Sequence, residues 1–228
     1  MVDGVVITID GPAAAGKSTV ARRLARQLGY DYLDTGATYR AATYKALDKG
    51  VDLTDPQRLA EIAASIELDF QEQEDGLRVL CDGDDVTDAI RRPEVTENIY
   101  HLADEPEVRK ALIDLQRRYA EGRNVVTEGR DQGTEVFPDA DVKFFLDAAP
   151  DIRAQRRMRD LKRAGCDRSY ESILQSIKER DRKDRGRQMG GLRHGEDMVL
   201  VDSTHRTVEE VLDLMTRIVG KRVRSANS

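Results

Sequence analysis

A phosphate-binding loop is the clearest chemical feature near the N-terminus. Gly11, Gly16, Lys17 and Ser18 fit the pattern G-x-x-x-x-G-K-[ST]. The glycines let the backbone curve inward with its N–H groups toward a phosphate, since a Cβ at either position would obstruct the loop. Lys17 can add positive charge at the β and γ phosphates, and the Ser18 hydroxyl can bind Mg²⁺. These residues predict a nucleoside triphosphate site.

The segments on either side are those that such a loop requires. Residues 5–9 form an apolar run that predicts a buried strand, and the apolar positions of residues 19–28 have helical spacing. The first N–H groups and the positive dipole end of that helix would face the same phosphates. A chance glycine-rich turn is the alternative, and it would not require this strand and helix. We therefore expect a nucleoside triphosphate to be bound by the whole loop, which comprises Gly11, Pro12, Ala13, Ala14, Ala15, Gly16, Lys17, Ser18 and Thr19.

Polar residues gather at the ends of two further predicted strands. Thr35 and Arg40 follow a short strand that ends in a Thr-Gly turn. Glu128, Arg130 and Asp131 emerge where a second apolar strand reaches a glycine turn. In open α/β folds ligands bind at the carboxyl edge of the sheet, so both sets are candidates for a site. For Thr35 and Arg40 the alternative is a capped turn with a solvated arginine.

Residues 151–187 are crowded with arginine. Two helices fit this segment, with a break at Gly165, and Arg180, Asp184 and Arg187 share one face of the second helix. A solvated helix with surface ion pairs is one reading. The other is a lid that closes over phosphates and excludes water, for which the planar fork of arginine is well suited.

The order of predicted elements indicates an α/β protein. Apolar strands at residues 142–146 and 198–202 bring the predicted number to five, and helical segments between them imply a parallel sheet with flanking helices. Short strands near residues 68–86 form a small antiparallel insertion, and residues 93–121 return to helices. Arg109 lies off the apolar stripe of the second of these helices, so a solvated surface arginine is its alternative reading. The fold class is a P-loop NTPase fold with an antiparallel insertion and a helical lid.

Composition limits the remaining possibilities. The chain has 228 residues, 35% of them charged, and a net charge of -6, which disfavours a nucleic-acid partner. Cys81 and Cys166 are too few for a disulfide framework or a zinc site, and His101, His194 and His205 fall outside every motif. No apolar run approaches the roughly 20 residues that span a bilayer. We expect a cytoplasmic protein with no membrane partner.

Six motifs together resemble those of bacterial cytidylate kinases. They are GPAAAGKST (11–19), DTGATYR (34–40), IRRPEV (90–95), EGRDQGT (128–134), VKFFLD (142–147) and IKERDRKDR (177–185). The resemblance implies transfer of the γ-phosphate of ATP to CMP or dCMP with Mg²⁺, by a monomer. It also implies a core of residues 1–33, 116–150 and 188–228, a monophosphate-binding insertion of residues 34–115, and a lid of residues 151–187.

The same resemblance assigns roles to individual residues. Arg109 and Asp131 would contact the cytosine ring, and Asp131 suits this role because a carboxylate accepts from the exocyclic amine of cytosine but not from the carbonyl of uracil. The other residues expected to bind the acceptor are Thr35, Arg40, Tyr100, Glu128, Arg130, Arg180, Asp184 and Arg187. The groups expected to act in catalysis are Lys17, Arg130, Arg180 and Arg187.

Within the acceptor set, Arg180 and Asp184 are matched to the ribose, and Arg130 and Arg187 to the phosphate, with Arg40 as a helper. Tyr100 and Glu128 depart from the family pattern, which usually has serine and aspartate at these places.

Three alternatives remain. The acceptor could be another nucleoside monophosphate. The chain could instead be a nucleotide-driven switch or ATPase, although the sequence has no convincing Walker-B acid or guanine-specifying motif. A catalytically silent binding module would have to explain why an intact Gly16-Lys17-Ser18 is accompanied by an arginine-rich lid.

Overall fold

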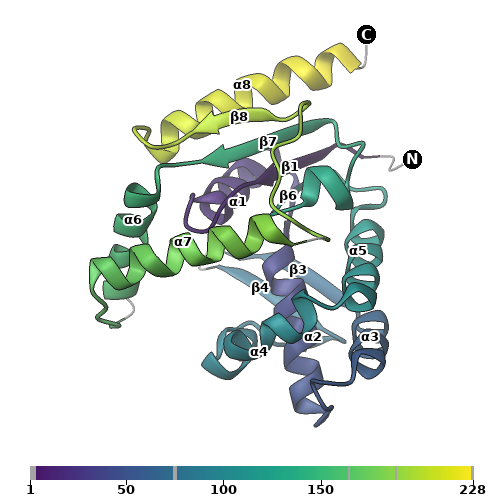
Figure 1. Ribbon diagram of the computed structural model, residues 1–228. Helices are drawn as coiled ribbons and strands as arrows, with labels where there is room; N and C mark the ends of the chain where they lie inside the picture. The colour runs from purple at the N-terminus through teal and green to yellow at the C-terminus, as the bar shows by residue number, and fades with distance from the viewer. Residues whose placement is uncertain (1–3, 74–75, 164, 188, 227–228) are drawn as a thin grey trace. The chain divides into compact units, whose positions relative to one another are not determined.

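The computed structural model describes residues 4–73, 76–163, 165–187 and 189–226 (Figure 1). The chain divides into two compact units. One comprises Met1–Gly4 and Tyr32–Arg123, the other Val5–Asp31 and Asn124–Ser228. We describe each unit by itself.

The main sheet has five strands in the order β2-β6-β1-β7-β8. The strands are β1 (Val6–Asp10), β2 (Asp31–Asp34), β6 (Val125–Gly129), β7 (Val142–Asp147) and β8 (Val199–Asp202). β1 pairs in parallel with β6 and β7, and β7 pairs in parallel with β8. Every residue of β1 and of β6 is buried, as expected for strands covered on both faces. The predicted five-stranded parallel sheet is confirmed.

Helices α1 (Lys17–Leu28) and α8 (Val208–Ala226) lie on the same face of this sheet. α1 contacts β6 and β1, α8 contacts β7, and the two helices contact each other (Figure 1). α1 buries Val20, Ala21 and Leu24, whose spacing places them on one side of a helix. This packing fixes the first turn of α1 at the carboxyl end of β1.

The arginine-rich segment folds as the two predicted helices, α6 (Pro150–Arg163) and α7 (Tyr170–Gly186). α7 begins after Ser169, whose hydroxyl accepts the Ser172 N–H at 3.2 Å. The two helices share a small apolar core. Its members are Ala154, Ile173 and Ile177, with Ala14, Leu161, Tyr170 and Leu174 packed against them. Because Ala14 belongs to the glycine-rich loop, this core joins α6 and α7 to the loop.

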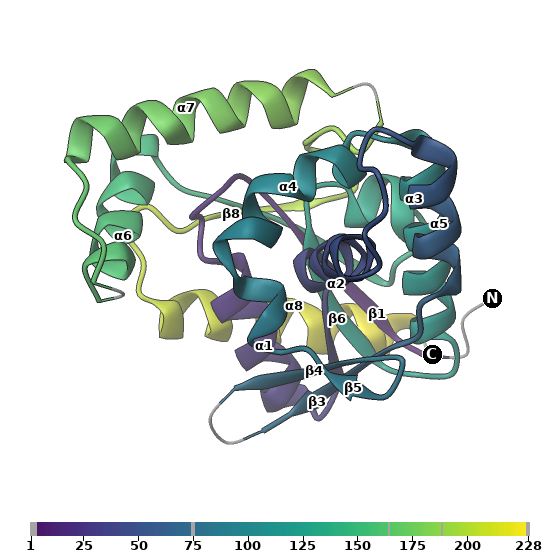
Figure 2. The same ribbon diagram turned by 90° about the horizontal axis from the view of Figure 1, so that it is seen from below.

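The unit that comprises Tyr32–Arg123 contains an antiparallel sheet in the order β3-β4-β5 (Figure 2). β3 (Leu68–Glu72) pairs with β4 (Leu77–Cys81), and β4 pairs with β5 (Asp84–Asp85). The predicted insertion of short strands is therefore present. The last strand is shorter than the sequence suggested, because Asp82 and Gly83 form the turn at φ 53° and 87°.

Four helices complete this unit. They are α2 (Thr35–Asp48), α3 (Pro56–Ser65), α4 (Pro93–Ala103) and α5 (Pro106–Ala120), with a short 3-10 helix η1 at Ala89–Arg91. The sequence analysis missed α3, although a start signal was present. Asp55 caps the helix by accepting the Arg58 N–H at 3.1 Å, and Pro56 occupies the first turn. α3 packs against α5.

None of the helices in the described ranges is long and apolar enough to cross a membrane. The predicted division into core, insertion and lid stays a prediction.

Candidate functional site

The glycine-rich loop needs its two glycines for different reasons. At Gly11 the backbone passes so close to the end of β7 that a Cβ would lie 2.0 Å from the Leu146 carbonyl oxygen. At Gly16 a Cβ would meet no described atom within 4 Å, so the loop itself would not obstruct it, and the expected obstruction of a bound phosphate stays a prediction. Gly16 is required instead by its φ of 97°, in the left-handed region where glycine is favoured, at the N-cap of α1.

Lys17 is buried at the start of α1. Its Nζ donates to the Pro12 carbonyl oxygen at 3.1 Å and lies 3.8 Å from Glu128 Oε2. Burial, with the positive charge of Arg130 as the next cause, lowers the pKa of Lys17 to about 7, and Glu128 offsets only part of this shift. A bound polyphosphate would supply the missing negative charge, so the site favours an anion with several charges.

Glu128 lies beside the loop, at the end of β6. It is buried, and its Oε1 accepts the Ser18 hydroxyl at 2.7 Å. The sequence analysis grouped Glu128 with the acceptor and found no convincing acid at the end of an apolar strand. The apolar Val125 and Val126 before it were the available signal. The lack of such an acid therefore no longer counts against a nucleotide-driven ATPase.

Ser18 and Glu128 together offer oxygen ligands of the kind that Mg²⁺ prefers. In the described part of the chain, no group of three or more His, Cys, Asp or Glu side chains could hold a metal ion. An ion bound at Ser18 would therefore need further oxygens from phosphate or water, which is how Mg²⁺ usually binds in nucleotide sites.

Arg130 and Asp131 follow β6 directly. Asp131 is buried and precedes η2 (Gln132–Val136), a single turn of π-helix. The Asp131 carbonyl oxygen accepts the Glu135 N–H at 2.8 Å and the Val136 N–H at 3.2 Å. Such π-turns are frequent at functional sites.

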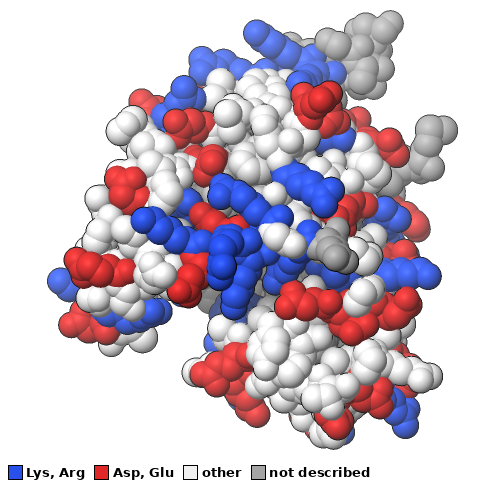
Figure 3. Space-filling model, viewed as in Figure 1, with Lys and Arg blue, Asp and Glu red and all other residues white. Residues whose placement is uncertain are grey.

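Asp184 gathers three of the predicted arginines. Its Oδ2 accepts from Arg130 Nε at 2.8 Å and lies 4.0 Å from Arg180 Nε, and its Oδ1 accepts from Arg187 at 3.3 Å. The Asp184 carboxylate is buried. One negative charge among three positive charges leaves an excess that suits a phosphate. Figure 3 shows Lys and Arg side chains gathering over α7.

Arg153 forms a second buried ion pair, which the sequence analysis did not single out from the other arginines. It is 2% exposed and donates to both carboxylate oxygens of Asp181, at 3.1 and 2.6 Å. It also donates to the carbonyl oxygens of Ala148 at 2.8 Å and of Ala13 at 3.1 Å. This side chain thus ties α6 and α7 to the backbone of the glycine-rich loop.

A pocket of about 390 Å³ adjoins the loop at Ala15, Gly16 and Thr19. Arg156 closes one side by donating to the Ala15 carbonyl oxygen at 3.2 Å and to the Ser203 hydroxyl at 3.0 Å. The other residues that line the pocket include Arg159, Arg163, Arg206, Val208 and Val211. Sequence reasoning missed this pocket, because its walls come from the glycine-rich loop, α6 and the start of α8.

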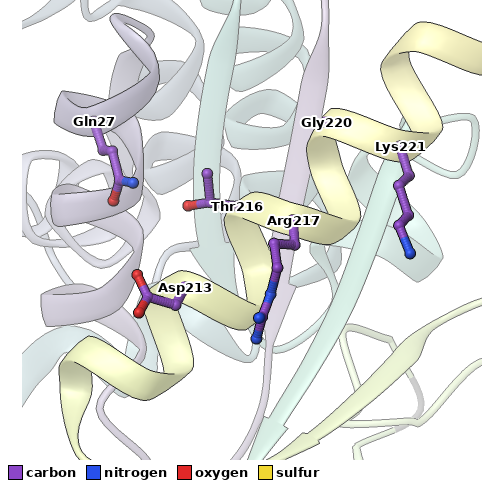
Figure 4. A pocket seen from close by; sticks show the side chains of 6 residues that line it. All are labelled: Gln27, Asp213, Thr216, Arg217, Gly220 and Lys221. Atoms are coloured by element: carbon purple, nitrogen blue, oxygen red, sulfur yellow. The ribbon is translucent and has the colours of Figure 1, made fainter.

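A second cavity, of about 460 Å³, lies between α1 and α8 (Figure 4). It is lined by Gln27, Asp213, Thr216, Arg217, Gly220 and Lys221. None of the predicted site residues lines it, so we do not connect it with the nucleotide.

The remaining predicted residues lie in the other unit. Arg109 is 4% exposed, which rules out a solvated surface arginine; it donates to the Ala103 carbonyl oxygen at 3.3 Å and lies 5.8 Å from the Tyr39 ring centroid. Thr35 is buried. Arg40 is half-buried and donates to the Thr96 hydroxyl at 2.8 Å.

Asp34 and Tyr100 lie in the same unit. The N-cap of α2 is Asp34, which accepts the Ala37 N–H at 3.0 Å, so the Thr35 hydroxyl is not needed for the cap. Tyr100 is 53% exposed, and its ring lies 4.1 Å from that of His101.

Comparison with known proteins identifies the family. The model of the family described as Cytidylate kinase matches residues 7–221. The cytidylate kinase of Caldanaerobacter subterraneus subsp. tengcongensis is 45% identical over 220 residues, 96% of each chain. That of Rhodopirellula baltica is 45% identical over 222 residues, 97% of this chain and 95% of the relative. That of Bacillus subtilis is 42% identical over 218 residues, 96% and 97%.

Solved structures agree on the fold alone. An uncharacterised protein from Eubacterium ventriosum has a TM-score of 0.55 at 15% identity, covering 96% of this chain and 99% of its own. TT1252 from Thermus thermophilus has a TM-score of 0.50 at 19% identity, covering 96% and 97%. The sequence relatives carry the more specific result, because their match extends over nearly the whole chain at more than 40% identity. The chain belongs to the cytidylate kinase family.

Proposed function

We propose that this protein transfers the γ-phosphate of ATP to CMP or dCMP, giving ADP and CDP or dCDP. The observation that carries the proposal is the charge arrangement around Lys17. Arg130 and Arg180 both lower the pKa of this buried lysine, and both belong to the arginine cluster on Asp184. Two separate cationic groups thus converge where a phosphoryl group would pass between donor and acceptor.

ATP binding is the better defined half of the proposal. The N–H groups of residues 13–18, which include the start of α1, would bind the phosphates, and Lys17 would neutralise the β and γ oxygens. The pocket beside Arg156 is next to Gly16 and Thr19, so it would hold the nucleoside part of ATP. Ser18 and Glu128 would hold Mg²⁺. When bound, the ion neutralises charge on the phosphate oxygens.

The acceptor half follows the residues matched to the family. Asp131 would accept a hydrogen bond from the cytosine amine, and the family match assigns Arg109 to the same ring. Arg180 and Asp184 would contact the ribose. The residues proposed to complete the acceptor site are Thr35, Arg40, Tyr100, Arg130 and Arg187.

Catalysis needs positioning and positive charge but no general base. The attacking atom is an oxygen of the acceptor phosphate, which is already an anion, so no proton has to be removed from it first. Lys17, Arg130, Arg180 and Arg187 would stabilise charge on the transferred phosphoryl group. Residues 151–187 act in this proposal as a lid over the core, and residues 34–115 as the monophosphate-binding insertion. Excluding water protects ATP from hydrolysis. The proposal includes a monomer acting in the cytoplasm.

A coupled assay of ADP release with CMP, dCMP, UMP and AMP tests the proposal. We expect CMP or dCMP to be the preferred acceptor, with the phosphorylated product formed in step with ADP. A clear preference for UMP or AMP would assign a different nucleoside monophosphate. ADP release without any phosphorylated acceptor would contradict phosphotransfer and would favour an ATPase.

The base-reading role has its own test. Asp131→Asn should narrow the ratio of kcat/KM for CMP over UMP by about 10- to 100-fold, because one directional hydrogen bond to the base is worth about 1–3 kcal/mol. Asp139→Asn is the matched control, since Asp139 is exposed and eight residues downstream. An unchanged ratio in the Asp131 variant would remove Asp131 from the base site.

A further inference from the structure

Asp10 is a buried carboxylate at the end of β1 to which no motif assigns a role. It is 0% exposed, yet it accepts two backbone hydrogen bonds from a segment more than 120 residues away. Oδ1 accepts the Gln132 N–H at 2.9 Å, and Oδ2 accepts the Gly133 N–H at 2.8 Å. Both amides belong to the first residues of η2, the turn that follows Asp131.

The first N–H groups of a helical turn have no acceptor within the turn and need one from elsewhere. Aspartate at the N-cap usually supplies it, as Asp34 does for α2 and Asp55 does for α3. Asp131 occupies the N-cap position of η2, but among the described residues its side chain makes no capping hydrogen bond. Asp10 supplies the cap instead.

The turn has little freedom to find another arrangement. A Cβ on Gly133 would lie 2.7 Å from Thr8 Oγ1 and 2.8 Å from Met198 Cε, so this part of the turn is seated directly on the sheet. The Thr127 hydroxyl donates to Gln132 Oε1 at 3.0 Å and holds the turn from β6. With the backbone confined in this way, the Gln132 and Gly133 amides depend on the carboxylate that they face.

Keeping a carboxylate at this position is costly. Burial raises the pKa of Asp10 to about 7, although the two amides and Lys17 act in the opposite direction and Asp131 adds repulsion. A neutral side chain would avoid this cost but would not place a separate acceptor oxygen on each N–H group, as the two carboxylate oxygens do. The buried carboxylate therefore lowers the stability of the fold, while its two hydrogen bonds hold the turn in place.

We propose that Asp10 is a positioning residue that caps η2 from β1, holding Arg130 and Asp131 at the nucleotide while the Asp131 carboxylate is relieved of the capping role. The part of this inference that places the Asp131 side chain at the nucleotide rests on the proposed function. The cap itself does not depend on that function, and the two can be tested separately.

Asp10→Asn is the direct test, made in the full chain and assayed at pH 8, where the wild-type carboxyl is ionised. Asparagine has one oxygen acceptor, and its NH₂ would face an N–H group, so one amide of the turn loses its partner. We expect the KM for CMP to rise about tenfold or more and discrimination against UMP to weaken, while the KM for ATP changes less than twofold.

Asp141→Asn is the matched control. Asp141 accepts the Val6 N–H at 2.8 Å, so it caps the opposite end of the same strand with the same chemistry. We expect its KM for CMP to stay within twofold of the wild type. If Asp10→Asn matches this control, or raises the KM for both substrates equally, Asp10 supports the fold or the phosphate loop and the proposal is overturned.

Hydrogen exchange gives a readout that needs no activity. The amides of Gln132 and Gly133 should exchange at least tenfold faster in Asp10→Asn than in the wild type, and those of Asp141→Asn should not. Unchanged exchange would overturn the proposal even if CMP is the substrate. Faster exchange in a protein that does not phosphorylate CMP would support the cap and reject the proposed function.

Thr127→Val covers the case in which Asp10→Asn does not fold. It removes the separate hydrogen bond from Thr127 Oγ1 to Gln132 Oε1, with little change of shape. We expect a smaller rise in the KM for CMP, about two- to fivefold, with ATP unaffected. A larger effect on ATP than on CMP would contradict a turn that serves the acceptor.

Discussion

Breaking the buried ion pair of Arg153 and Asp181 should strongly destabilise the unit that contains the lid helices. The guanidinium is 2% exposed and the Asp181 side chain 7% exposed, and their closest atoms are 2.6 Å apart. Asp181→Asn leaves Arg153 charged and buried without a carboxylate partner, since its remaining acceptors, the Ala148 and Ala13 carbonyl oxygens and one side-chain amide oxygen, are neutral. Removing one partner of such a pair costs about 3–5 kcal/mol.

For a chain of this length, each 1 kcal/mol lowers Tm by about 2–4 °C, so we expect a decrease of about 6–20 °C. Urea titration followed by circular dichroism measures the change in the free energy of unfolding. Because Arg153 also donates to Ala13 in the glycine-rich loop, the KM for ATP should rise in the same variant.

Two controls make this prediction specific. Glu209→Gln breaks an ion pair with Arg23 of similar length, 2.8 Å, whose side chains are 48% and 66% exposed. This variant should unfold like the wild type, because solvent screens exposed pairs. Adding Arg153→Met to Asp181→Asn removes both charges and should recover part of the stability. If the free energy of unfolding of Asp181→Asn equals that of the wild type, the predicted cost of leaving Arg153 buried without a carboxylate partner is wrong.

Three further predictions concern the site. Lys17→Ala should lower kcat at least about 100-fold while the circular dichroism spectrum is retained, because it removes charge stabilisation from the transferred group; substantial retained turnover would refute its role. Arg187→Ala should lower kcat by about 100-fold with little change in the Kd for ATP; a loss confined to ATP binding would place Arg187 on the donor. The third concerns pH: burial raises the pKa of Asp10 from 3.8 to about 7, so ionising it costs the folded state stability as pH rises from about 4 to about 7. The free energy of unfolding of Asp10→Asn should therefore rise relative to that of the wild type between pH 4 and 7, by at most about 4 kcal/mol. Above about pH 7 the difference should stay constant. Urea titrations of both proteins from pH 4 to 9 measure this difference, and a constant difference over that whole range would contradict the shift.

Local patterns were enough to predict most elements of the fold. The apolar run before Gly11, the helical spacing after Ser18 and the break at Gly165 each depend on residues near one another in the chain. The parallel sheet followed from the alternation of strands and helices. α3 was missed even though Asp55 and Pro56 marked its start, so that error was not imposed by the sequence.

The identity of the phosphate loop and of the lid arginines was likewise readable from spacing. Arg180, Asp184 and Arg187 share a face because helical periodicity places them there, and the structure adds that Asp184 also holds Arg130. The role of Glu128 was harder to predict. Its contact with Ser18 spans 110 residues, and the place in the acceptor site that its motif predicts stays a prediction.

Spacing within the chain therefore determined which segments are strands, helices and phosphate-binding turns, since helices and turns form through hydrogen bonds over a few residues and strands carry a local apolar pattern. Tertiary packing alone decided which charges are buried and what they hold. Arg153 is one arginine among many in its segment until Asp181 and Ala13 close around it, and Asp10 is an ordinary strand end until the turn after Asp131 folds onto it. Burial depends on contacts between distant segments, and burial is what turns a common ion pair or cap into one that positions a site.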